Sequence, residues 1–234
     1  MKKLAVFVEG LTEQLFVTRF VTAIAGKHAV AIQQSRVTGN RNKGQWRRVW
    51  ASAQGDGQKY FVLIVDCSSD SRVKSEIRDH YDSLVSAGYS AIIGIRDVFP
   101  EFAYAELPRL RAGLEYRMKT KPIRVTFALG VMEIETWFIC EHTHFTRLDA
   151  RLAPEYISSK LDFDPSRDDI QQRQTPAVDL DAAYRLVGLR YKKDRQCLQR
   201  TLDLLDYVSL YLSVVERVPD FKALVQALDV FLAN

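Results

Sequence analysis

The chain has 234 residues, enough for one good-sized domain or for one domain with an appendage. Its composition, 47% hydrophobic and 26% charged, is that of an ordinary globular protein and argues against disorder. The net charge of +4 permits binding to nucleic acid or phosphate without establishing it. No apolar run is long enough to span a membrane, and the first run ends at Glu9, too early for a signal peptide.

The cysteine and histidine patterns exclude two common kinds of site. Cys67, Cys140 and Cys197 are too few and too scattered for a disulfide framework or a zinc site. His142 and His144 are close in sequence but have no further ligands at metal-binding spacing, so we expect no metal there. These features suit a reducing compartment, and we expect a cytoplasmic protein without membrane contact.

Apolar runs alternate with amphipathic segments along the first 140 residues. This pattern predicts strands over 4–8, 29–37, 60–66, 90–97 and 123–131, and helices over 12–26, 46–54, 71–87 and 101–119, the last interrupted at Pro108. Residues 146–176 are polar and irregular, whereas 179–234 are expected to be wholly helical. The alternation predicts an α/β fold with a mostly parallel sheet flanked by helices. We expect a catalytic domain over 1–140, with a mainly helical region over 141–234 packed on it.

Acidic residues follow three of the expected strands. Glu9, Asp66 and Asp97 each stand where an apolar run ends. In a parallel sheet these ends share one edge, which is where ligands bind in α/β proteins. The sequence therefore predicts a cluster of carboxylates at one edge of the sheet.

Two of these acids are repeated four residues later, as Glu9 with Glu13 and Asp66 with Asp70. Converging carboxylates repel one another by about 4 kcal/mol per pair at ~4 Å and an effective dielectric near 20, so cations or protons must offset them. Oxygen ligands favour Mg²⁺ or Mn²⁺ over zinc, and one or two such ions can promote phosphodiester hydrolysis. Helix capping and the helix dipole offer another explanation for Glu13 and Asp70, but they do not explain Glu9 or Asp66.

Several further residues have two interpretations. Asp97 is either a third-strand ligand or an ordinary loop acid, and Ser68 is placed to help position a water near the metal. Glu133 and Glu135 follow the last expected strand, and alternation would direct both to one face if that strand continues. They either support the site from outside the ligand shell or are structural.

Basic residues gather in two places. The loop over residues 36–48 carries five basic side chains beside Trp46, a combination that can hold a phosphate backbone and stack on a base: Arg36, Arg41, Lys43, Arg47 and Arg48. Arg190, Lys192 and Lys193 form a second cluster, in which one lysine could neutralise the charge that develops on a phosphoryl group. Solvated surface positions are the alternative for both groups.

The acidic motifs resemble those of the TOPRIM fold, in particular the nuclease domain of the overcoming-lysogenisation-defect (OLD) family and its stand-alone relatives in phage defence. The resemblance rests on the segment VEGLTE from Val8 to Glu13, on the Asp66-to-Asp70 spacing and on Asp97, and covers roughly residues 1–140. Position 68 is Ser, so the D-x-D form of topoisomerases and primases is absent. The resemblance implies that Glu9, Glu13, Asp66 and Asp70 are metal ligands and catalytic residues, with Asp97 as an additional one.

These observations favour a Mg²⁺-dependent (or Mn²⁺-dependent) nuclease that cleaves DNA or RNA as a phage-defence effector. The sequence contains no Walker A motif, so the ATPase that accompanies OLD-like domains, of the ABC or AAA type, would be a separate partner. The alternatives are a non-cutting regulatory subunit of such a complex and a small-molecule enzyme that handles nucleotides. Any excess apolar surface on the C-terminal helices would serve a partner or a homo-oligomer.

Overall fold

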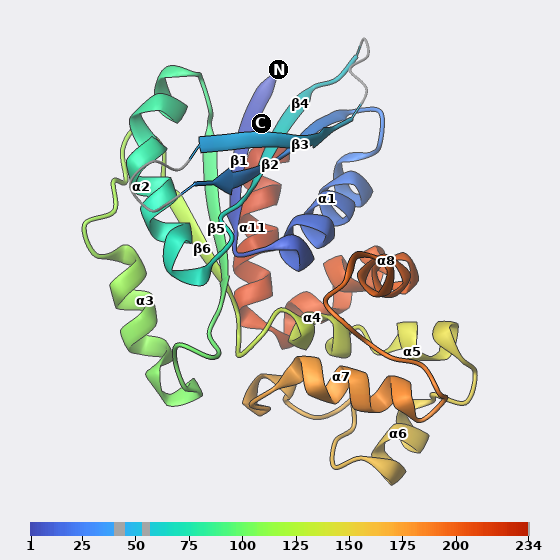
Figure 1. Cartoon of the computed structure of the whole chain (residues 1–234). Coiled ribbons are helices and arrows are strands. Elements are labelled where there is room, and N and C mark those ends of the chain that lie inside the picture. Colours follow the sequence, from blue (N-terminus) through green and yellow to red (C-terminus); the bar gives the residue numbers. More distant parts are fainter. Residues whose placement is uncertain (40–44, 53–56, 234) are drawn as a thin grey trace. The chain divides into compact units, whose positions relative to one another are not determined.

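The computed structural model describes residues 1–39, 45–52 and 57–233, and its centre is a six-stranded sheet (Figure 1). The strands follow the order β3-β2-β4-β1-β5-β6. Their bounds are β1 Lys2–Val8, β2 Val30–Thr38, β3 Gln45–Ala51, β4 Tyr60–Asp66, β5 Ala91–Asp97 and β6 Val125–Gly130. β1 pairs in parallel with β4 and β5, β2 pairs in parallel with β4, and β3 is antiparallel to β2. The expected α/β fold with a mostly parallel sheet is confirmed.

The central strands are nearly pure apolar runs because both faces of the sheet are covered. Helix α1 (Leu11–Ala25) and the end of α11 (Pro219–Ala233) lie on one side, and α2 (Asp70–Ser86) lies on the other (Figure 1). Gln14 of α1 donates through its side-chain amide to the carbonyl oxygens of Ser35 and Ile64, which ties this helix to β2 and β4. Tyr60 of β4 likewise donates to the carbonyl oxygen of Leu232 in α11.

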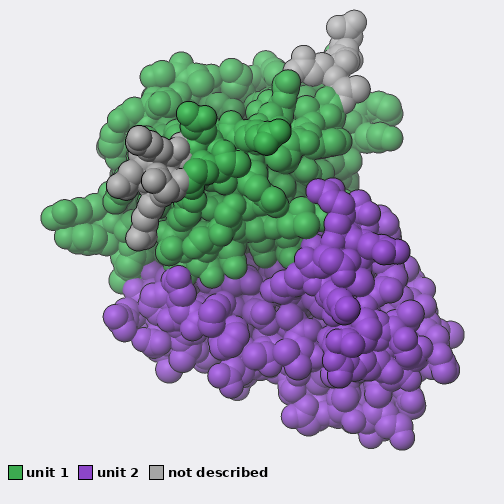
Figure 2. All heavy atoms as spheres, viewed as in Figure 1, with its two compact units in different colours: residues 1–96, 111–128, 223–234 green, residues 97–110, 129–222 purple. Residues whose placement is uncertain are grey.

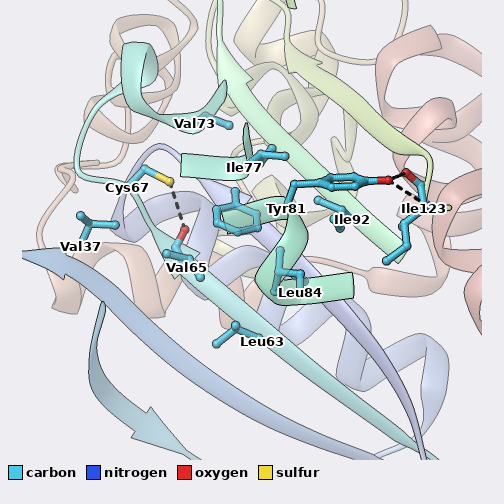
Figure 3. Close-up of a cluster of buried hydrophobic side chains, with 12 residues drawn as sticks. Val37, Leu63, Val65, Cys67, Val73, Ile77, Tyr81, Leu84, Ile92 and Ile123 are labelled. Atoms are coloured by element: carbon cyan, nitrogen blue, oxygen red, sulfur yellow. Dashed lines mark hydrogen bonds between the residues drawn. The ribbon is translucent and has the colours of Figure 1, made fainter. Parts of the chain in front are cut away.

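The core under α2 shows how alternation selects the buried face (Figure 3). Phe7, Val65 and Val37 come from three neighbouring strands and meet Val73 and Ile77 of the helix. The Tyr81 hydroxyl anchors the same core. It donates to the carbonyl oxygen of Ile123 at 2.6 Å and accepts from the Ile123 amide at 3.0 Å, as the dashed lines in Figure 3 mark.

The expected helix over 46–54 is wrong, because residues 45–51 form the edge strand β3. Its residues are mostly exposed, so the apolar alternation that identifies a half-buried strand is weak. Pairing with β2 determines its conformation, with a register shift between Gln34 and Ser35. Tertiary pairing therefore overrides the local pattern here.

Two expectations for the C-terminal half also need correction. The segment 146–176, expected to be irregular, contains the end of α5 (Thr143–Leu148), α6 (Pro154–Lys160) and a 3₁₀ turn (Ile170–Gln172). The segment 179–234 is helical only in pieces: α7 (Pro176–Arg185), α8 (Arg195–Leu204), short turns α9 (Tyr207–Ser209) and α10 (Val215–Arg217) around a π-helical stretch, and α11. Asp194 and Asp206 accept backbone N–H groups as N-caps, which explains why new helices begin after them. A 3₁₀ turn (Tyr104–Glu106), α3 (Leu107–Glu115) and α4 (Glu135–Cys140) complete the described elements.

The chain forms two compact units that are discontinuous in sequence (Figure 2). The first comprises residues 1–96, 111–128 and 223–234, and the second comprises 97–110 and 129–222. The division between the two units does not follow a single boundary at residue 140, because each unit combines separate segments of the chain. Within the described ranges, no helix combines the length and apolar character needed to cross a bilayer.

A buried histidine makes the stability of the protein depend on pH. His144 is fully buried, and its Nδ1–H donates to the carbonyl oxygen of Glu141 at 2.7 Å. Burial lowers the pKa of His144 to about 4, below the value near 6.5 of an exposed imidazole. The unfolded chain therefore binds the proton first, and the contribution of His144 to stability is lost as the pH falls from about 6.5 to 4.

We expect this loss to be about 3 kcal/mol in the free energy of unfolding. Denaturant unfolding of the protein and of His144→Gln between pH 7 and 4 measures it. The substitution removes the titrating group, so its stability should fall less steeply over this interval. Parallel pH profiles for the two proteins would contradict the assignment to His144.

Candidate metal centre

Three carboxylates meet at the carboxyl edge of the sheet. Glu9 directly follows β1, Glu13 lies in the first turn of α1, and Asp97 is the last residue of β5, which pairs with β1. Each offers one oxygen, and these oxygens lie within 4.8 Å of one another. Glu13 and Asp97 are 4% and 3% exposed, and Glu9 is half-buried. Three negative charges are therefore held close together where little solvent screens them.

Local structure positions two of these side chains. Glu13 accepts the backbone N–H of Gly10 at 2.9 Å through Oε2, a capping contact that fixes its carboxylate at the start of α1. Asp97 accepts the backbone N–H of Ile134 at 2.8 Å through Oδ1. Gly130 lies directly against the same oxygen, because a Cβ at that position would be 2.3 Å from it.

Asp66 reaches the same edge but has a different partner. It is the last residue of β4, and in the strand register it lies opposite Val8, the residue before Glu9. Its Oδ2 is 2.7 Å from Nε of Arg36, while its Oδ1 accepts the Ser68 amide at 2.8 Å and lies 3.4 Å from the Ser68 hydroxyl. Ser68 has a positive φ of 61°, a strained conformation for this residue type. Asp66 is thus not a member of the three-carboxylate group.

Asp70 and Cys67 lie in the same turn. Asp70 begins α2 and is buried, and it too is outside the three-carboxylate group. Burial raises the pKa of the Cys67 thiol well above its usual value, and the charges of Glu76 and Asp66 add to this effect. Cys67 is therefore an uncharged neighbour of the acidic edge, and the protonated thiol disfavours a role as a nucleophile.

Glu133 and Glu135 form a separate cluster with residues from the loop before α8. β6 ends at Gly130, so the two side chains are not placed by strand alternation. Lys193 Nζ is 3.3 Å from an oxygen of each glutamate, and the Tyr191 hydroxyl donates to Glu135 at 2.6 Å. Burial raises the pKa of Glu135, although Lys193 opposes the shift. Lys193 is thus part of an ion-pair network although its side chain is 45% exposed, and Lys192 is exposed as well.

The basic residues expected to bind nucleic acid are only partly described. Arg41 and Lys43 lie outside the described residues, and Arg47 and Arg48 are exposed on β3. Trp46 packs inward: its indole N–H donates to Glu76 at 3.0 Å, and its ring lies 4.2 Å from that of His80. Trp50 on the same strand is 46% exposed and is the aromatic side chain that remains accessible there.

The donor set fits a hard divalent cation. Carboxylate oxygens are the ligands that Mg²⁺ and Mn²⁺ prefer, and Gly130 leaves the space that the Asp97 carboxylate occupies. Sequence reasoning missed Gly130, Trp50 and Tyr191, and it counted Arg36 among the basic residues of the 36–48 loop without its pairing with Asp66. Only the strand register shows that Arg36 lies on β2 and faces Asp66.

Comparison with known proteins adds no relatives. No protein-family model matches the chain, and no significant match was found among curated proteins or solved structures.

Proposed function

We propose that this protein is a Mg²⁺- or Mn²⁺-dependent nuclease that hydrolyses phosphodiester bonds in DNA or RNA. The observation that carries the proposal is the group formed by Glu9, Glu13 and Asp97, whose oxygens lie within 4.8 Å of one another at the carboxyl edge of the sheet. That edge is where parallel α/β sheets bind their ligands. The motif resemblance to TOPRIM nucleases supports the same activity independently of this geometry.

Each part of the edge has a role in this proposal. Glu9, Glu13 and Asp97 hold the cation, which when bound supplies Lewis acidity and lowers the pKa of a water. The positive charges of Arg36, Arg47 and Arg48 attract the phosphate backbone and hold it beside the acidic edge. Trp50 offers an exposed ring for stacking on an unpaired base.

A cleavage assay tests this function. The purified protein is incubated with plasmid DNA and with total RNA, in the presence of Mg²⁺, Mn²⁺ or a chelator. We expect cleavage of one substrate that requires the divalent ion and is lost in Glu13→Gln. Cleavage that persists in chelator, or equal cleavage by Glu13→Gln, would contradict the proposed function.

We further propose that a separate ATPase regulates this activity, since the chain has no Walker A motif of its own. Repeating the assay with candidate ATPases and ATP tests that partnership. Ion binding without cleavage under every condition would instead favour a regulatory subunit.

A further inference from the structure

Arg36 and Asp66 form an ion pair at the carboxyl edge of the sheet. Nε of Arg36 is 2.7 Å from Oδ2 of Asp66, whose side chain is almost fully buried. The two residues are register partners on the adjacent parallel strands β2 and β4, so the backbone places them opposite each other. A guanidinium is charged at every physiological pH, so this positive charge is permanent.

Asp66 lies one strand away from the three-carboxylate group. Its register partner on β1 is Val8, and Glu9 is the next residue. Neighbouring strands are about 4.8 Å apart, so Asp66 stands where a second cation beside the first would find a ligand. Both oxygens of Asp66 already accept hydrogen bonds, from Arg36 and from the Ser68 amide.

We propose that the centre takes one divalent ion, and that the Arg36 guanidinium occupies the position of a second. This inference rests on the proposed function, because it assumes that Glu9, Glu13 and Asp97 hold the single ion. A second ion near Asp66 would meet the charge of Arg36 and would have to displace a close charge-assisted hydrogen bond.

The same residue is suited to hold a substrate phosphate. Only Nε of the guanidinium donates to Asp66 in the described contact, and the Arg36 side chain is 47% exposed. The group has further N–H donors in a planar fork that matches phosphate oxygens. Arg36 thus neutralises a buried carboxylate and presents positive charge to the backbone of a nucleic acid.

The number of bound ions tests this inference without any activity measurement. Calorimetric titration of the full chain with Mn²⁺ should give one ion per chain for the wild type. Arg36→Gln frees Asp66 and should give two, whereas Arg36→Lys keeps a cation there and should give one. Arg47→Gln is the matched control, since Arg47 is an exposed arginine in register with Arg36 on β3, and it should also give one.

The outcomes separate the two proposals. If the wild type binds two ions, the inference about Arg36 fails while the metal centre stands. If the wild type binds none, the proposed function itself fails. One ion in a folded Arg36→Gln protein, checked by circular dichroism, would show that Arg36 does not exclude the second ion, and it would overturn the inference.

Discussion

Asp97→Asn is expected to weaken divalent-ion binding by more than about a hundredfold and to remove ion-dependent cleavage. Substitutions outside the ligand shell of a metal commonly reduce its affinity by about 10–100-fold, and Asp97 would be a direct ligand. The amide keeps an oxygen to accept the Ile134 N–H, so the local fold should persist. What changes is the charge, because one of three close carboxylates becomes neutral. Mn²⁺ titration and the cleavage assay measure the two effects.

Asp82→Asn is the control for this substitution. This control makes the same Asp-to-Asn change at an exposed position of α2. The Asp82 side chain is 79% exposed and pairs with Lys119. A surface pair of this kind contributes little to stability, so binding and cleavage should both be retained. If Asp97→Asn bound Mn²⁺ as tightly as Asp82→Asn does, Asp97 would not be a ligand.

The sheet and its acidic edge were predictable because each depends on short stretches of sequence. Buried parallel strands are continuous apolar runs, and β1, β4 and β5 each have one that ends at or just before an acid. Those runs place Glu9, Asp66 and Asp97 at one edge once the strands are parallel. The expected α/β fold is therefore confirmed, although the segment expected to be a helix over 46–54 is the edge strand β3.

The finer grouping of the acids was not predictable from spacing. The two four-residue spacings make Asp66 and Asp70 look equivalent to Glu9 and Glu13, yet the structure groups Asp97 with the glutamates. Asp66 instead pairs with Arg36, which faces it only because β2 lies next to β4. Such contacts depend on strand order, and a local pattern contains no information about it. The exposed edge strand β3 escaped prediction for the same reason.

Gly130→Ala is expected to weaken ion binding although the substitution changes no charge. A Cβ at this position would be 2.3 Å from Oδ1 of Asp97 and 2.7 Å from the backbone nitrogen of Ile134. Both distances are shorter than real contacts, and the Ile134 atom belongs to the backbone, so the Asp97 carboxylate must move. Overpacking of this kind costs about 1–3 kcal/mol, and the displaced carboxylate leaves the three-carboxylate group.

Thermal unfolding with and without Mn²⁺ separates these two effects. An ion that binds only the folded state adds about 2.7 kcal/mol when its concentration is a hundred times its Kd. We expect Gly130→Ala to have a lower Tm and to lose most of the Mn²⁺-dependent increase. Gly113→Ala in α3 is the matched control, because nothing lies within 4 Å of its Cβ and alanine favours a helix by about 1 kcal/mol. It should keep the full Mn²⁺ response, and an equal response in Gly130→Ala would show that the contact between Gly130 and Asp97 does not position a ligand.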